Sequence, residues 1–162
     1  MATKHDFHKV VIGRSEELTF VDFNIVKVPA KTDTGAYRSA VHADNIVEKD
    51  GELTFRLLGG HPVCGSMATS VTTDKYKIVR VENSFGYGED RYEVRLRVKL
   101  GSKIFLAPFS LADRSAKIYP ILLGRKLLNH RFLVDSAESS LNRTELKKKY
   151  GILFPKDEEG RK

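Results

Sequence analysis

The heptapeptide AKTDTGA, Ala30 to Ala36, limits how this chain can fold. It follows an apolar segment, residues 20–28, so it lies where a β-strand should end. Asp and Gly both disfavour strand interiors, and together they are typical of a turn. A carboxylate at such a strand-to-loop corner is held firmly and stays accessible, as a catalytic acid must be. By itself the Asp33-Thr34-Gly35 tripeptide is a weak signal, and it favours an ordinary Asx-type turn over a catalytic site.

The composition is that of one globular domain with its own core. The chain has 162 residues, of which 41% are apolar and 30% charged. The single cysteine, Cys64, excludes an internal disulfide and fits a reducing compartment. We find neither a signal-peptide core nor an apolar run of about 18 residues. A cytoplasmic protein with no membrane partner is therefore expected.

The net charge of +7 raises the question of an anionic partner such as nucleic acid. The positive charges alternate along the expected strands and gather locally only at Lys147, Lys148 and Lys149. That distribution is typical of a solvated basic face. The sequence therefore does not favour nucleic-acid binding.

Apolar and polar residues alternate with a period of two along much of the chain. In residues 91–100 every second residue is apolar and the others are charged, which predicts a half-buried antiparallel strand with a wet outer face. Turn residues separate such segments at short intervals, which favours an all-β barrel or sandwich over a parallel βαβ sheet. Further strands are expected at residues 8–12, 20–28, 42–47, 52–57, 69–81, 103–109 and 119–122.

Helical signals are few and lie in the last third of the chain. One or two turns are expected over residues 124–130. Residues 139–150 are the better candidate, with serine caps, lysines in the last turn and Gly151 as a stop. We expect one barrel domain over residues 1–138. Residues 139–162 should form a C-terminal helix and a charged, disordered tail rather than a separate domain.

Two longer strings resemble the retropepsin-like aspartic proteases. AKTDTGAYRSAVHA, residues 30–43, resembles their active-site strand, and YPILLGRKLLNHRFLVD, residues 119–135, resembles their Gly-Arg signature with its short helix. More closely, residues 9–135 resemble a bacterial family often labelled "putative ATP-dependent zinc protease", found beside RimK-type ATP-grasp ligases. The further motifs that carry this resemblance are residues 11–14 (VIGR), 42–43 (HA), 80–86 (RVENSFG), 111–114 (LADR) and 134–135 (VD).

The resemblance implies a closed retropepsin-like β-barrel with a short helix after the Leu-Leu-Gly-Arg strand. The label also implies zinc and ATP, but neither a phosphate-binding Gly-x-x-x-x-Gly-Lys-Ser/Thr loop nor His-Glu-x-x-His is present. Only His61 and Cys64 have ligand-like spacing, and two ligands do not make a tetrahedral site. We expect no cofactor, no metal ligands, a packed or hydrogen-bonded His42 and an inert Cys64. A zinc-dependent hydrolase is the lesser alternative.

The resemblance further implies that Asp33 is the catalytic acid–base group of an aspartic endopeptidase. Such enzymes hold the attacking water between two carboxylates that share one proton. This chain carries one Asp-Thr-Gly, and Asp135-Ser136-Ala137 lacks the glycine. The second carboxylate is therefore expected from Asp33 of a second chain across a two-fold axis. The alternative is a catalytically silent peptide-binding or regulatory module that acts with an ATP-grasp ligase.

Other roles follow from the same resemblance. Thr34 would lock the two active-site loops together, Gly35 would let the substrate backbone approach, and Gly124 and Arg125 would give structural support. Residues 82–91 would form a flap hairpin, with residues 59–66 as the alternative flap. The peptide or protein substrate is expected to contact Ala36, Arg38, Ser84, Phe85, Gly86 and Tyr87.

The chain departs from the retroviral pattern just after Asp-Thr-Gly-Ala. Retroviral members carry an acid there that pairs with the arginine of Gly-Arg, whereas this chain has Tyr37-Arg38-Ser39. Arg125 must therefore find another partner. The rim of the site becomes more basic, which would favour acidic substrates, by analogy with ligases that add acidic residues to proteins.

Overall fold

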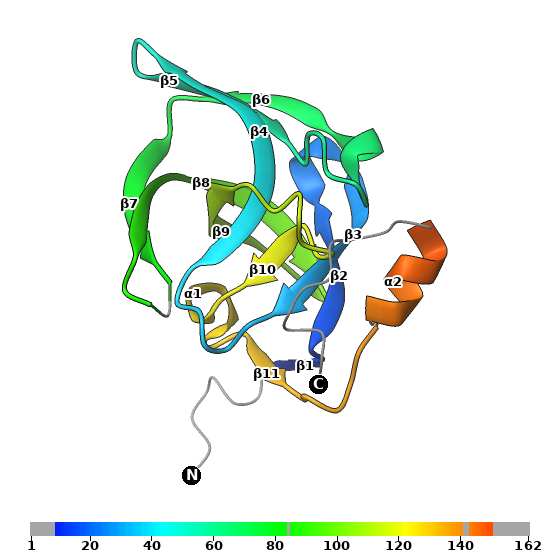
Figure 1. The fold of residues 1–162 in the computed structure, drawn as a ribbon. Coiled ribbons are helices and arrows are strands. Elements are labelled where there is room, and N and C mark those ends of the chain that lie inside the picture. Colours follow the sequence, from blue (N-terminus) through cyan, green and yellow to red (C-terminus); the bar gives the residue numbers. More distant parts are fainter. Residues whose placement is uncertain (1–8, 84, 141–142, 151–162) are drawn as a thin grey trace.

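The computed structural model describes residues 9–83, 85–140 and 143–150. Within them the chain is almost entirely β-structure, with short turns and two short α-helices (Figure 1). The strands are β1 (Val10–Ile12), β2 (Ser15–Phe20), β3 (Ile25–Thr32), β4 (Ser39–Lys49), β5 (Glu52–Leu57), β6 (Thr69–Thr73), β7 (Tyr76–Glu82), β8 (Gly88–Leu100), β9 (Lys103–Ala112), β10 (Ile121–Leu123) and β11 (Phe132–Val134). The helices are α1 (Arg125–Leu128) and α2 (Arg143–Tyr150).

Six strands close into a barrel, in the order β10, β3, β2, β8, β9 and β4, with β4 returning to β10. Strand β10 runs parallel to β3 on one side and antiparallel to β4 on the other. The loop between β3 and β4, residues 33–38, therefore joins two strands that are separated by β10. This arrangement confirms the retropepsin-like barrel predicted from the sequence.

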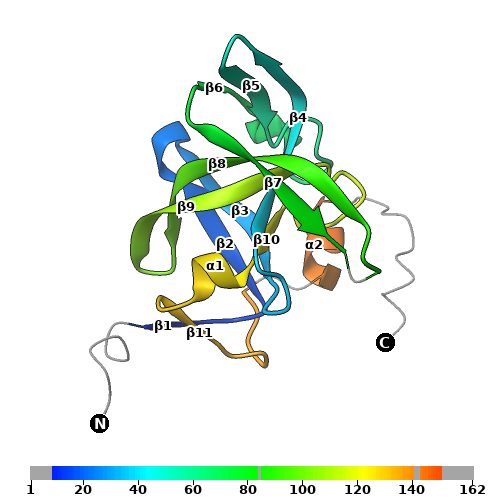
Figure 2. The same cartoon turned by 90° about the vertical axis from the view of Figure 1, so that its left-hand side faces the viewer.

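The remaining strands extend the barrel at three places. Strands β5 and β6 continue the sheet beyond β4, and β7 pairs with β8 to form a long hairpin. Strands β1 and β11 pair in parallel as a separate two-stranded sheet, which lies below the barrel in Figures 1 and 2.

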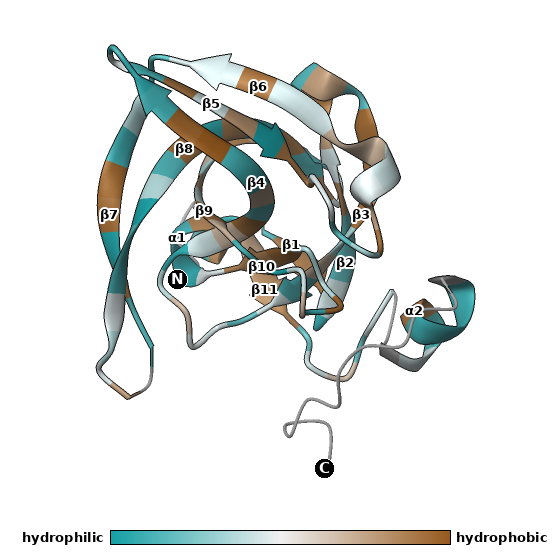
Figure 3. Cartoon of the chain, turned by 45° about the horizontal axis from the view of Figure 1, so that its top comes forward, coloured by the Kyte–Doolittle hydropathy of each residue, from teal (hydrophilic) through white to brown (hydrophobic). Residues whose placement is uncertain are grey.

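The core follows from the alternation along the strands, which Figure 3 shows as bands of apolar and polar colour. In β8, Val94, Leu96, Val98 and Leu100 are buried, as the period-two pattern predicts. Their burial removes apolar surface from water, the main driving force for folding at this chain length. The largest fully buried side chains are Phe20, Phe55, Phe109, Leu18, Leu53, Leu57, Leu58, Leu100, Ile121, Leu123, Leu127 and Leu146.

Two predicted strands are wrong as single elements. The segment 20–28 reverses direction: a 3-10 turn, Val21–Phe23, ends at Asn24 with φ 51°, and Phe20 then pairs with Ile25. Asn tolerates this left-handed conformation, so the turn needs neither glycine nor proline. The segment 69–81 is likewise divided into β6 and β7. Strand β2 was not predicted, because its first three residues, Ser15, Glu16 and Glu17, show no alternation of apolar and polar side chains.

Helix α2 begins at Arg143, later than the predicted start at residue 139. It is attached to the barrel through the fully buried Leu146, which clusters with Val63 and Ile118. Figure 1 shows α2 beside β2 and β3, on the side of the barrel opposite β7. The expected tail at residues 155–162 lies outside the described residues, and the domain boundary at residue 138 stays a prediction. No helix in the described part of the chain has the length and apolarity needed to cross a bilayer.

Candidate active site

Asp33 lies at the corner where β3 ends. Its backbone N–H donates to the carbonyl of Leu123, the last residue of β10, at 2.9 Å, which ties the corner to the neighbouring strand. The Gly35 N–H donates to Asp33 Oδ1 at 3.0 Å, and the Ala36 N–H donates to the Asp33 carbonyl at 3.2 Å. The expected Asx-type turn therefore exists. It orients the carboxylate of Asp33, which stays half-buried and thus partly accessible.

The Gly124-Arg125 segment is hydrogen-bonded to the main chain of this turn. The N–H groups of Arg125 and Lys126 donate to the carbonyls of Ala36 and Tyr37 at 2.8 and 2.9 Å. Arg125 Nη1 donates further to the carbonyls of Thr34, at 3.1 Å, and of Gly35, at 2.9 Å. The alternative partner that Arg125 needed is thus the main chain of the active-site turn. The two main-chain bonds use N–H groups that α1 leaves unpaired at its N-terminus.

Arg38 is engaged in a buried charge cluster. Its Nη1 lies 2.6 Å from Glu93 Oε2, and the ammonium groups of Lys77 and Lys126 lie 3.5 and 3.7 Å from Oε1. The side chain of Glu93 is only 3% exposed, and the three cations compensate the burial of its carboxylate. The expected wet outer face of β8 is therefore wrong at Glu93. The active-site loop, α1 and β7 cover the strand there, and no local pattern in the sequence reveals that.

Arg114 lies in the loop that follows β9, and its charge interacts with that of Asp33. Its Nε donates to the carbonyl of Tyr119 at 3.0 Å. Burial lowers the pKa of Arg114 to about 10, the nearby charge of Arg91 acts in the same direction, and the charge of Asp33 opposes both. Arg114 is thus within electrostatic reach of both Arg91 and Asp33. The sequence singled out Arg114 only as the end of a motif.

Two buried histidines anchor the Arg114 loop. His42 Nδ1 accepts the Arg114 N–H at 2.9 Å, so its proton is on Nε2, which donates to the Gly59 carbonyl at 2.7 Å. His61 Nδ1 accepts a backbone N–H, and its Nε2–H points at the carbonyls of Arg114 and Lys117, at 3.0 and 2.9 Å. Both rings are therefore satisfied as neutral imidazoles, which confirms the hydrogen-bonding role expected for His42.

The segment HPVC lacks the surroundings of a metal site. Burial raises the pKa of the Cys64 thiol to about 12, which fits the inert, packed side chain expected there. In residues 9–83, 85–140 and 143–150, no three His, Cys, Asp or Glu side chains are grouped so that they could hold a metal ion.

Burial lowers the pKa of His61 to about 4, which predicts a pH-dependent stability. The unfolded chain binds the same proton near pH 6.5, so between about pH 6.5 and 4 it holds more protons than the folded protein. The free energy of unfolding should therefore fall as the pH falls through that window, by up to about 3 kcal/mol. In His61→Gln, whose amide can both donate and accept, this contribution should be missing. Urea titrations at several pH values measure it.

His130→Gln is the matched control because His130 is exposed. The pH profile of this variant is compared with that of His61→Gln, so that the contribution of the buried ring is separated from the loss of any one histidine. An identical pH profile for His61→Gln and the wild type would contradict the assigned neutral, buried imidazole.

The hairpin β7–β8 is the predicted flap segment, and its tip is stabilised by one side chain. Asn83 Oδ1 accepts the N–H groups of Phe85 and Tyr87 at 3.0 and 3.1 Å. Phe85 and Tyr87 are 84% and 77% exposed, while Gly86 adopts φ 81°. Ser84 lies outside the described residues. The alternative flap, residues 59–66, is a compact turn that contains the buried His61.

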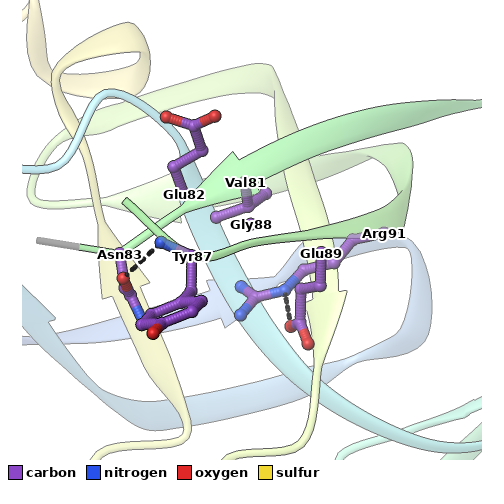
Figure 4. Close-up of a pocket in the computed structure, with 7 residues that line it drawn as sticks. All are labelled: Val81, Glu82, Asn83, Tyr87, Gly88, Glu89 and Arg91. Atoms are coloured by element: carbon purple, nitrogen blue, oxygen red, sulfur yellow. Dashed lines mark hydrogen bonds and ion pairs between the residues drawn. The ribbon is translucent and has the colours of Figure 1, made fainter. Parts of the chain in front are cut away.

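A cavity of about 290 Å³ opens at the tip end of this hairpin, where β7 ends and β8 begins (Figure 4). Figure 4 shows Glu89 and Arg91 projecting from β8 and joined by an ion pair. The cavity is lined by Val81, Glu82, Asn83, Tyr87, Gly88, Glu89 and Arg91.

A sequence profile described as RimB-like, "Retropepsin-like aspartic endopeptidase RimB", matches residues 11–145. The chain belongs to the RimB-like family. The family resemblance predicted from the two signature strings is confirmed by this match.

Relatives and a solved structure agree with the RimB-like assignment. A "Probable alpha-L-glutamate ligase" of Desulfotalea psychrophila is 30% identical over 159 residues, which cover 94% of this chain and 34% of that protein. A protein of the same name from Shewanella halifaxensis is 30% identical over 155 residues, covering 90% and 33%. The chain thus spans about a third of the length of the curated relatives it matches. The crystal structure of Legionella pneumophila Lpg0085, of unknown function, matches with TM-score 0.62 and 30% identity over 80% of this chain and 95% of that one.

Proposed function

We propose that this protein is an aspartic endopeptidase in which Asp33 from each chain of a homodimer holds and activates one water molecule. The ionised carboxylate would take a proton from the water, and the protonated one would polarise the scissile carbonyl. The observation that best supports this is the Asp33 turn. Its carboxylate is oriented by the Gly35 N–H, and its backbone is tied to β10 and α1.

The second carboxylate would come from a second chain, because the sequence holds one Asp-Thr-Gly turn. Asp135 also accepts a turn N–H, from Ala137 at 3.0 Å, but it follows β11 on the separate two-stranded sheet. On that sheet Val11 and Leu133 are register partners, exposed by 61% and 53%. These apolar side chains would be covered in a dimer, and the exposed Thr34 would meet its counterpart across the axis.

The proposed substrate is an acidic peptide, with glutamyl residues near the cleaved bond. Arg114, which lies within electrostatic reach of Asp33, gives its surroundings a positive charge. Relatives named as alpha-L-glutamate ligases support a functional link to an ATP-grasp ligase that would make such peptides. Ala36 and the flap residues Ser84, Phe85, Gly86 and Tyr87 would contact this substrate, whereas Arg38 is engaged by Glu93. The mechanism requires neither zinc nor ATP.

Dimerisation and hydrolysis, measured together, test the proposal. Sedimentation with and without a statine-containing glutamyl peptide, which imitates the tetrahedral stage, should show a dimer that the peptide strengthens. Oligoglutamate incubated with the protein should yield shorter fragments by mass spectrometry. A protein that stays monomeric with the statine peptide and cleaves no oligoglutamate would overturn the proposal.

The alternative is a silent peptide-binding module that regulates a ligase. The names and the greater length of the curated relatives favour it, since the equivalent region there is part of a longer protein named as a ligase. This alternative predicts binding of oligoglutamate without hydrolysis, and a ligase rate that changes when this protein is added.

A further inference from the structure

Arg114 is a half-buried cation that has no carboxylate partner. In the described parts of the chain no ion pair to its guanidinium is formed, although burial already lowers its pKa. The neighbouring Asp113 is committed elsewhere: its Oδ1 accepts the N–H and the hydroxyl of Ser115. Arginines that do have a carboxylate partner are Arg38, Arg56, Arg80, Arg91 and Arg97.

A partly desolvated charge without a partner costs folding free energy. An interaction with an anion would reduce that cost. Asp33 supplies only part of it, because it lies within electrostatic reach but does not form an ion pair with Arg114. The positive charge of Arg91 makes the environment less favourable still. An anion that enters between these groups would therefore be attracted to Arg114.

The Arg114 segment is held rigidly. Its N–H donates to His42 Nδ1, its carbonyl accepts from His61 Nε2, and its Nε donates to the Tyr119 carbonyl. The two imidazole rings pack edge to face with centroids 5.1 Å apart. Backbone and Nε are thus fixed, while the two Nη groups have no hydrogen-bond partner in the described chain. A preorganised guanidinium of this kind binds an anion at little entropic cost.

We propose that Arg114 binds a carboxylate side chain of the peptide substrate and thereby sets the preference for acidic over neutral peptides. This rests on the proposed function in one respect, namely that peptides bind beside Asp33. The Nη groups would bind the carboxylate as a fork, with two N–H···O bonds. Arg114 is therefore a specificity-determining residue, and His42 and His61 position it.

Binding can be measured without turnover in an Asp33→Asn background. The probes are a fluorescein-labelled glutamyl octapeptide and its glutamine counterpart, followed by anisotropy. Arg114→Gln should weaken binding of the glutamyl peptide by roughly tenfold to a hundredfold and leave the glutamine peptide unchanged. Arg114→Lys should recover only part of the loss, because it keeps the charge and loses the fork. Arg95→Gln, an exposed arginine on β8, is the matched control and should behave as the parent.

The preference of the parent for the glutamyl peptide must depend on Arg114 and not on Arg95. Equal binding of the glutamyl peptide by Arg114→Gln and the parent would overturn the inference, as would an equal loss for both peptides. If circular dichroism shows that Arg114→Gln does not fold, Arg114→Lys takes its place. A preference for the glutamyl over the glutamine peptide equal to that of the parent would then overturn the inference. Discrimination that depends on Arg114 in a protein that cleaves nothing would refute the peptidase and leave the carboxylate site standing. Cleavage of the glutamyl peptide with a preference that does not change in the Arg114 variants would support the peptidase and refute the carboxylate site at Arg114.

Discussion

An Asp33→Asn protein should keep its fold and lose peptidase activity by about a thousandfold. Asparagine has nearly the same shape, and its Oδ1 can still accept the Gly35 N–H that closes the turn. It cannot take a proton from water, so a dimer of such chains has no general base. Initial rates of oligoglutamate cleavage measure the loss, and thermal melting followed by circular dichroism reports the fold.

Asp50→Asn is the matched control for the loss of a carboxylate. Asp50 is exposed in the turn between β4 and β5, at φ 53°, a conformation that asparagine also adopts. Its substitution should leave the rate within about twofold of the wild type, since exposed polar changes have small effects. An Asp33→Asn protein as active as this control would refute the assignment of Asp33.

Mixing wild-type and Asp33→Asn chains separates a shared dyad from a single-chain site. In an equimolar mixture of freely exchanging chains, about a quarter of the dimers carry two Asp33 residues. Activity should therefore follow the square of the wild-type fraction. A linear dependence would show that each chain works alone.

A Gly124→Ala protein should be less stable by about 3 kcal/mol or fail to fold. A methyl group at this position would lie 2.5 Å from the carbonyl oxygen of Arg38 and 3.0 Å from that of Ala36. Both are main-chain atoms of the active-site loop, and Arg125 already binds the Ala36 carbonyl. The loop cannot retreat without breaking that support. Urea denaturation measures the change in the free energy of unfolding.

Gly65→Ala is the control for the added methyl group, because the closest atom to it would be Gly60 backbone carbon at 3.5 Å, an ordinary contact. Its unfolding free energy should change by less than about 1 kcal/mol. Equal stability of Gly124→Ala and Gly65→Ala would mean that α1 and the Asp33 loop do not pack as closely as described.

The sequence alone determined the features that depend on neighbours along the chain. Alternation placed most strands and the buried face of β8, because side chains in a strand point to opposite sides in turn. Turn chemistry placed Asp33 at the end of a strand, and the two signature strings indicated the family. The reversal at Asn24 was missed, since it lacks glycine and proline and the apolar residues on both sides read as one strand.

Only the tertiary structure decided the electrostatics of the site. Glu93 appeared to be an exposed strand residue, and it is buried because Arg38, Lys77 and Lys126 arrive from three other segments. Arg114 comes near Asp33 because β9 pairs with β4 and the two histidines fasten the loop that follows. Charge interactions depend on separation in space and on burial, and pairing between distant strands sets both.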